Sequence, residues 1–298
     1  MAALSEPLRF LLFFFLLCDS PVYAGKCHKG DKKVLLSIKN SIGDYIFTGW
    51  TSDFACCDWS GVGCDEVSNR VTALDVGQTN TTFSLPAAVS DLPFLTSLSF
   101  HKNPGLVGPI PAAIGTMVGL TFLRLDWNSL SGPHPPTLTP SIRNRLTGPL
   151  PPGIFSNTSG AYLRLSHNGL SGEVPPSYGA VEFLQVDLSR NRFTGDASFL
   201  FGRGKGTQQI DLSRNVFEFD LGKVEFPEAE LIALDLNHNK IYGSIPKQIA
   251  EVENLQLFNV SYNRLCGEIP TGGRLDRFDQ YCYLHNKCLC GAPLPPCK

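Results

Sequence analysis

Short segments in which apolar and polar residues alternate recur along most of this chain. They follow the pattern Leu-x-Leu-x-x-Asn-x-Leu-x-Gly, often with Ile-Pro after it, as in residues 163–172. The asparagines from Asn144 to Asn263 follow one another at sequence steps of 24, 23, 24, 24 and 24. Alternation predicts a short strand with one buried face, and a fixed period of this length predicts a stack of similar coils. Further copies begin at Leu98, Leu123, Val186, Ile210, Leu234 and Phe258.

The residues of the pattern indicate how the coils stack. An asparagine side chain carries two donors and an acceptor, so it can satisfy backbone groups of its own coil and of the neighbouring coil. Gly allows a tight turn, and Pro fits an extended, non-helical path. We therefore predict an α/β fold: a right-handed leucine-rich-repeat solenoid with a concave parallel β-sheet and a ladder of asparagines.

One repeat departs from the period. The step from Asn128 to Asn144 is much shorter than the others, by about a third of the period. The expected strand leucines are replaced by Thr139 and Ser141, with Pro140 between them, and Pro inside a strand removes a donor. We expect a truncated repeat near residues 133–146, which has lost its strand and interrupts the concave sheet after Asn128.

Both ends of the chain differ from the repeats. A short apolar run, residues 10–17, follows Arg9 and is too short to span a membrane, so residues 1–24 are predicted to be a signal peptide. We divide the rest into an N-terminal cap (25–67), leucine-rich repeats (68–265) and a C-terminal cap (266–298). Residues 31–39 have helical spacing and are expected to cover the first coil. The mature protein is expected to be extracellular, in the cell wall or apoplast, without a membrane span.

Cysteine usage agrees with export. The chain has ten cysteines; Cys18 lies in the predicted leader, and the other nine fall at the two ends, with none from 65 to 265. Disulfides at both ends suit a solenoid whose terminal coils need sealing. Nine is an odd number, so one thiol is left unpaired.

Charge and motifs argue against several classes of function. The net charge of −2 does not favour a nucleic-acid partner. The chain has neither His-Glu-x-x-His nor Gly-x-Ser-x-Gly, and residues 202–207 lack the spacing of a phosphate-binding loop. We therefore expect no enzyme activity, no cofactor and no metal, and a protein, most simply a monomer, that binds another macromolecule.

The sequence resembles the polygalacturonase-inhibiting proteins of plants over essentially its whole mature length. The resemblance rests on the Leu-x-Gly-x-Ile-Pro form of the repeat, as in residues 106–111, on the Cys-Cys-Asp-Trp segment 56–59, and on cap segments 265–273 and 286–297. It implies disulfides Cys27–Cys56, Cys57–Cys64, Cys266–Cys288 and Cys290–Cys297, with Cys282 left over. It also implies inhibition of a fungal endopolygalacturonase in plant cell-wall defence, through the concave face. The alternative is a non-inhibitory recognition protein in receptor signalling or development. An ice-binding relative would need regular columns of small polar residues, which the concave charges argue against.

The candidate partner-binding surface is the set of residues that face outward beside the repeat leucines. Exposed aromatic and arginine side chains are typical of binding surfaces, whereas the aspartates also fit a merely solvated repeat consensus. The predicted residues are Arg124, Asp126, Trp127, Arg164, Ser166, His167, Gln185, Asp187, Arg190, Gln208, Asp211, Arg214, Asp235 and His238.

Two further kinds of site are expected. Basic residues of adjacent coils suit a polyanion such as pectin, although an ordinary solvated edge has the same composition; they are Arg190, Arg192, Arg203, Lys205 and Arg214. Asn-x-Ser/Thr motifs predict glycosylation at Asn80, Asn157 and Asn259.

Overall fold

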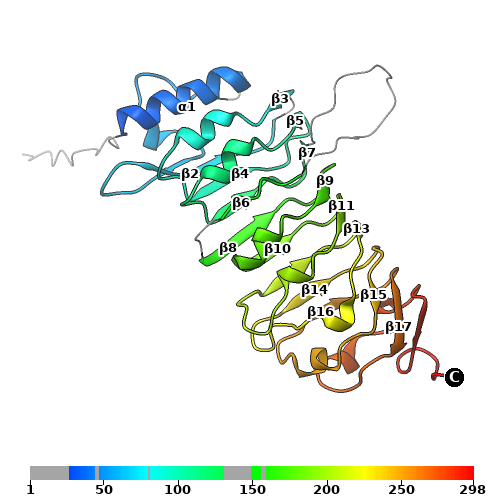
Figure 1. Cartoon of the computed structure of the whole chain (residues 1–298). Coiled ribbons are helices and arrows are strands. Elements are labelled where there is room, and N and C mark those ends of the chain that lie inside the picture. Colours follow the sequence, from blue (N-terminus) through cyan, green and yellow to red (C-terminus); the bar gives the residue numbers. More distant parts are fainter. Residues whose placement is uncertain (1–26, 44–46, 80, 131–148, 156–158) are drawn as a thin grey trace, which may run out of the picture.

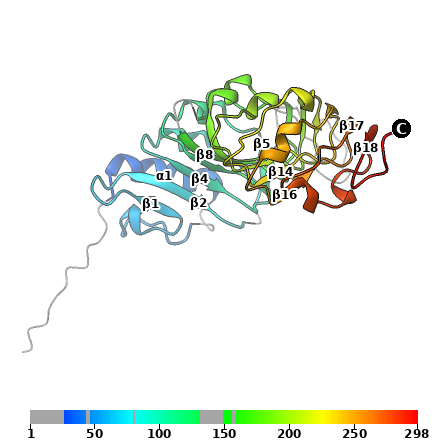
Figure 2. The same cartoon turned by 90° about the horizontal axis from the view of Figure 1, so that it is seen from below.

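The computed structural model describes residues 27–43, 47–79, 81–130, 149–155 and 159–298. Over these residues the chain is a curved solenoid, with its two caps at opposite ends (Figures 1 and 2). Each typical coil contains a strand of one long sheet, a tight turn, a short outer strand and a turn of 3-10 helix. The predicted leucine-rich-repeat fold is confirmed.

The long sheet lines the concave side and has the strand order β1-β2-β4-β6-β8-β10-β12-β14-β16. Strands β1 and β2 pair antiparallel, whereas the other neighbours pair parallel. The strands are β1 Val62–Cys64, β2 Val71–Val76, β4 Ser97–Phe100, β6 Phe122–Arg124, β8 Ser159–Arg164, β10 Glu182–Asp187, β12 Gln209–Asp211, β14 Ala233–Asp235 and β16 Leu257–Asn259.

The outer strands form three separate three-stranded sheets, β3-β5-β7, β9-β11-β13 and β15-β17-β18. Their bounds are β3 Phe83–Ser84, β5 Leu106–Gly108, β7 Ser129–Leu130, β9 Ser171–Glu173, β11 Arg192–Gly195, β13 Val216–Phe217, β15 Tyr242–Gly243, β17 Arg264–Glu268 and β18 Cys288–Cys290.

In the described part of the chain, helix is confined to the N-terminal cap and to short turns, most of them on the side of the coils away from the concave sheet. The α-helix α1 spans Lys29–Ile42, so it includes the stretch predicted from its helical spacing. The 3-10 helices are η1 Cys56–Asp58, η2 Ala87–Asp91, η3 Ala112–Thr116, η4 Pro176–Ala180, η5 Ser198–Leu200, η6 Leu221–Lys223, η7 Lys247–Glu251, η8 Leu275–Arg277 and η9 Gln280–Cys282. Among the described residues, no helix is both long enough and apolar enough to cross a membrane.

The repeat leucines form one continuous core between the concave sheet and the outer turns. Leu123, Leu125, Leu163 and Leu165 are fully buried, and the corresponding side chains of the other described coils join them. Because each coil buries these side chains against its neighbours, the stack is stable only when both ends are covered.

The predicted asparagine ladder is present. In Asn191, Nδ2 donates to the carbonyl oxygens of Leu165, in the previous coil, and of Leu188, in its own coil, while Oδ1 accepts from the N–H of Leu170. The same kind of bond to the previous coil recurs along the stack. The ladder residues are Asn103, Asn128, Asn168, Asn191, Asn215, Asn239, Asn263 and Asn286.

The concave sheet continues across the irregular repeat, contrary to the expected interruption. Strand β6 pairs directly with β8, with Arg124 opposite Arg164, although the chain between these strands is much longer than one period. Leu130 N–H donates to Asn168 Oδ1 at 3.2 Å, so the ladder also passes over the gap. The sheet closes because two regular flanking strands can pair without an intervening one. The predicted truncated repeat itself lies outside the described residues.

Four disulfides close the two caps, and they are the pairs that the family resemblance implies: Cys27–Cys56, Cys57–Cys64, Cys266–Cys288 and Cys290–Cys297. Cys282 keeps a free thiol. An ion pair also joins the N-terminal cap to the start of the repeats, where the Arg70 guanidinium donates to both oxygens of the buried Asp31 at 2.9 and 2.8 Å.

Candidate binding surface

One outward position of the concave strands forms a row across the sheet. Parallel pairing sets equivalent residues side by side, so each coil contributes one side chain to this row. We call it the central row; in register order it contains Asp75, Ser99, Arg124, Arg164, Asp187, Asp211, Asp235 and Asn259.

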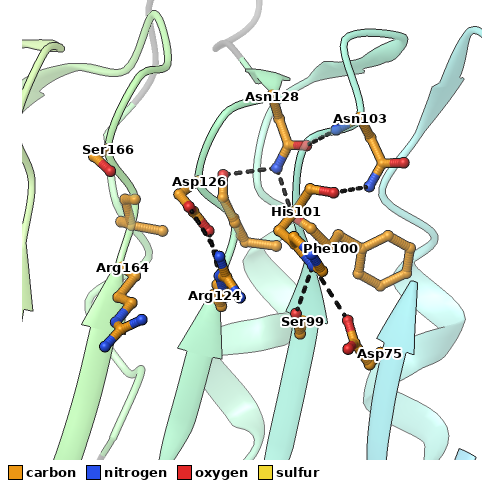
Figure 3. A network of polar contacts seen from close by, with 12 residues as sticks. Asp75, Ser99, Phe100, His101, Asn103, Arg124, Asp126, Asn128, Arg164 and Ser166 are labelled. Carbon is orange, nitrogen blue, oxygen red and sulfur yellow. Dashed lines mark hydrogen bonds and ion pairs between the residues drawn. The ribbon is translucent and has the colours of Figure 1, made fainter. Parts of the chain in front are cut away.

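The charge of the central row changes sign along the solenoid. Two arginines, Arg124 and Arg164, occupy neighbouring strands in its N-terminal half, and three aspartates follow them. Arg124 forms an ion pair with Asp126, with 2.7 Å between Nε and Oδ1. Arg164 instead donates from Nε and Nη2 to the neutral Oε1 of Gln185, at 3.1 and 2.6 Å. Figure 3 shows both arginines on the same side of the sheet.

The three aspartates of the row lie beside a hollow of about 190 Å³, which Gln185, Gln209 and Leu257 also line. Burial, together with the charge of Asp211, raises the pKa of Asp235 to about 6, against the hydrogen bonds from Asn237 and the charge of Arg214. Burial also raises the pKa of Asp211. Both carboxyl groups therefore titrate at a higher pH than an exposed aspartate.

A second row runs along the carboxyl ends of the concave strands, one residue before each ladder asparagine. These residues adopt left-handed backbone conformations, with φ between 54° and 62°, which direct their side chains away from the core. We call this row the turn row; it contains Lys102, Trp127, His167, Arg190, Arg214, His238, Tyr262 and His285.

Several residues predicted to face outward from strands belong to the turn row instead. Trp127, His167, Arg190, Arg214 and His238 follow their strands in the tight turn. A pattern of alternating residues locates the strand but not the residue at which it ends, so the prediction extended the strands too far.

Aromatic rings stack along the turn row. Trp127 is 52% exposed, and the centroid of its ring lies 3.6 Å from that of His167. Tyr262 stacks between His238 and His285, at 4.1 Å from each. Burial and the nearby Arg190 lower the pKa of His167, so its ring favours the neutral form.

Other predicted residues are less available to a partner. Asp126 and Ser166 are buried, and Asp126 is occupied by Arg124. Gln185 and Asp187 lie on the concave strand β10, as predicted. Gln208 does not lie on a strand, because it directly precedes β12, and it is only partly exposed. The turn-row residues Tyr262 and His285 were not predicted, although each stands directly before an asparagine in the sequence pattern that defines the other positions.

The five predicted basic residues do not form one compact patch. Arg190 and Arg214 lie in the turn row, and Arg192 begins the outer strand β11. Arg203 and Lys205 belong to the return segment before β12, beyond the amino ends of the concave strands. Lys205 Nζ donates to the carbonyl of Gly179 at 2.7 Å, and Arg203 pairs with Glu228 at 3.0 Å.

The described residues offer little for metal binding. Sulfur atoms of Cys27, Cys56 and Cys57 lie within 4.8 Å of one another, but all three cysteines are in disulfides and cannot act as thiolate ligands. The surface therefore consists of charged and aromatic side chains on a rigid sheet, an arrangement suited to contact with another macromolecule.

Comparison with known proteins identifies the family. The leucine rich repeat N-terminal domain model matches residues 28–65. The polygalacturonase inhibitor of Pyrus communis is 46% identical over 322 aligned positions, which cover 97% of this chain and 96% of that protein. Polygalacturonase inhibitor 1 of Arabidopsis thaliana is 44% identical, with 97% and 98% covered. The crystal structure of a plant ice-binding protein matches with a TM-score of 0.61 and 40% identity, covering 92% of this chain and 99% of that chain.

The first of these alignments is longer than this chain. It has 322 positions, whereas this chain has 298 residues, so at least 24 positions of the relative have no counterpart here. With the capped leucine-rich-repeat fold and this degree of identity over nearly the whole chain, the protein belongs to the polygalacturonase inhibitor family of leucine-rich-repeat proteins.

Proposed function

We propose that this protein inhibits a fungal endopolygalacturonase by binding it through the central row and the turn row. The observation that carries the proposal is the uninterrupted concave sheet, which holds both rows on a rigid support across the irregular repeat. A rigid surface loses little conformational entropy on binding, which favours affinity. The names of the relatives, polygalacturonase inhibitors, supply the enzyme class.

The sequence motifs support action outside the cell. Residues 1–24 have the features of a secretory leader, and four disulfides fit an oxidising compartment. We propose export to the cell wall as a monomer. Of the three proposed glycosylation sites, Asn80 and Asn157 lie outside the described residues. Asn259 is partly exposed at the end of the central row, so a glycan there would limit access to that end.

The test is release of reducing ends from polygalacturonate by a panel of fungal endopolygalacturonases, with and without the purified protein. We expect at least one enzyme to be slowed, with saturation at equimolar protein if binding is tight. A pectate lyase acting on the same polymer is the control, because it would be slowed only if the protein masked the substrate. A folded sample that slows no polygalacturonase would refute the proposal and favour a recognition role in signalling or development.

Pectin is a second proposed ligand, favoured by the adjacent positions of Arg190 and Arg214 in the turn row. Two neighbouring guanidinium groups suit the repeated carboxylates of pectate. Retention on immobilised pectate should fall when both are changed to Gln. Equal retention of this variant and the wild type at low salt would mean that Arg190 and Arg214 do not bind pectin.

Ice binding has less support than inhibition. The outer strands form three separate sheets, so no single regular outer sheet runs along the described coils. The concave side has charged side chains of both signs in its central row. A measurement of thermal hysteresis in the purified protein would detect this activity directly.

A further inference from the structure

The two arginines of the central row stand opposite each other on neighbouring strands, Arg124 on β6 and Arg164 on β8. Like charges placed directly opposite on adjacent strands destabilise a sheet. Leu123 and Leu163, which form the buried pair of the same register, would pack equally well beside neutral neighbours. The packing of this register therefore does not require two arginines side by side. Such local conflicts are expected at functional sites.

The fold neutralises one of the two charges only. Arg124 is held by Asp126, which is buried and lies two positions further along the chain. Arg164 has a different environment, because its guanidinium donates twice to the amide oxygen of Gln185. Among the described residues, no carboxylate lies within ion-pair distance of Arg164. Its neighbour Asp187 instead accepts from the N–H and the hydroxyl of Ser189, at 3.0 and 2.7 Å.

Gln185 also fixes the direction of the guanidinium. Bonds from Nε and Nη2 occupy one edge of the planar group and leave donors of Nη1 and Nη2 for a further acceptor. A guanidinium that is already oriented loses less side-chain entropy when it binds a carboxylate. Arg164 therefore has both an uncompensated charge and a fixed orientation.

We propose that Arg164 anchors an aspartate or glutamate side chain of the bound enzyme on the concave face. This inference rests on the proposed inhibitory function and names the chemistry of one contact within it. A single protein carboxylate fits better than a polyanionic polysaccharide. A polymer along the row would meet Asp187, Asp211 and Asp235 immediately beyond Arg164, and their charges would repel it.

The test compares inhibition constants for one susceptible polygalacturonase. Arg164→Gln should raise the inhibition constant at least about tenfold, because an interfacial charge contact is lost. The matched control is Arg277→Gln, which removes an exposed arginine of η8 outside both rows and should change the constant by less than about threefold. Melting temperatures of all variants report whether the solenoid is intact.

A second readout does not depend on affinity. In the Arg164→Lys variant, the new amine should be coupled to an enzyme carboxylate by a water-soluble carbodiimide, and mass spectrometry should recover a cross-linked peptide containing position 164. A carbodiimide joins only groups in direct contact, so this result would also identify the carboxylate. The absence of any cross-link from position 164 in an inhibited complex would overturn the inference.

The possible results distinguish a failure of the Arg164 anchor from a failure of the proposed inhibitory function. If the wild type inhibits and Arg164→Gln inhibits equally well, the anchor is refuted and the inhibitory function stands. If Arg164→Gln keeps full inhibition but is less well retained on pectate, the carboxylate belongs to the polysaccharide and the inference is overturned. If the wild type inhibits no polygalacturonase, both proposals fall.

Discussion

The side-chain amide of Asn168 donates to the carbonyl oxygen of Leu125 at 2.7 Å, although the two residues are 43 positions apart. In a regular coil the equivalent bond, from Asn191 to Leu165, spans 26 positions. The hydrogen bond that crosses the irregular repeat therefore joins the same two groups, a ladder asparagine amide and a leucine carbonyl, as the bond between regular coils. Asn144, which the sequence pattern offers as an intermediate ladder residue, lies outside the described residues.

The first prediction concerns residues 132–147 of the irregular repeat. Deleting residues 132–147 restores the regular sequence step between Asn128 and Asn168. It also joins Ser131 to Gly148, so that the chain reads Asn-Ser-Leu-Ser-Gly-Pro-Leu-Pro, the repeat consensus. We expect the variant to fold and its melting temperature to stay the same or rise, because a shorter connection costs less closure entropy.

Circular dichroism and thermal unfolding of the deletion variant check this prediction. A matched deletion of equal length elsewhere, such as 176–191, removes η4, β10 and a ladder asparagine and should prevent folding. A large loss of stability in the first variant would mean that residues 132–147 pack against the solenoid.

The fold could be predicted largely from the sequence because the repeat determines it locally. Each coil contains its own strand, turn and ladder asparagine, so a regular spacing is sufficient to place them. The pairing of β6 with β8 could not be predicted, because it depends on which strands meet across the irregular repeat and not on the pattern within one coil. A short step between successive asparagines, followed by a regular one, fits a coil that keeps its place in the stack without a strand. It fits equally well a segment that contributes no coil to the stack.

The candidate site was predicted in composition but not in arrangement. The pattern identified Arg124, Arg164 and the aspartates as outward residues, and they form the central row. It did not separate Trp127 and His167 as members of a turn row, because the left-handed backbone there is set by the turn and not by the side chain. It also did not show that Asp126 is buried beneath Arg124, since side-chain pairing within a coil leaves no periodic signal.

The second prediction is that the ladder rung at the irregular repeat is as important for stability as a regular rung. Asn168→Ala should lower the free energy of unfolding by about 2–4 kcal/mol, because Leu130 N–H and the Leu125 carbonyl lose their buried partner. Asn215→Ala in a regular coil should have a similar effect. Urea unfolding measures both, and a negligible effect of Asn168→Ala alone would mean that water replaces this rung.

The third prediction concerns pH. The pKa of Asp235 is about 6 in the folded protein, above its ordinary value of 3.8. Between these values the folded state binds more protons than the unfolded state, so this group makes stability fall as pH rises from about 4 to 6. Asp235→Asn should remove that loss and be about 1–2 kcal/mol more stable than the wild type near pH 7, after allowance for partial exposure.

Comparison with the wild type at each pH isolates the contribution of Asp235. The gain should vanish below about pH 4, where the carboxyl group is protonated in both states. Asn can still accept the hydrogen bond from the N–H of Asn237, so the turn is kept. Asp91→Asn, on an exposed outer turn, is the control and should show no such difference. A gain for Asp235→Asn that is independent of pH would contradict the explanation.

The fourth prediction assigns a large share of the binding energy to Trp127. The residue is 52% exposed and its ring is stacked on His167, so it presents a rigid aromatic surface at the end of the concave strands. Aromatic residues held in this way are frequent hot spots in protein interfaces. Trp127→Ala should raise the inhibition constant about 30-fold or more, which corresponds to about 2 kcal/mol.

Folding and binding can be separated in this experiment. Because about half of Trp127 is exposed, its loss should change the free energy of unfolding by less than about 1 kcal/mol. The other two tryptophans, Trp50 and Trp59, are buried in the N-terminal cap, so acrylamide should quench Trp127 preferentially in the free protein. Addition of the enzyme should protect this fluorescence. Phe54→Ala, on an exposed part of the cap, should leave inhibition unchanged, and unaltered quenching in an inhibited complex would place Trp127 outside the interface.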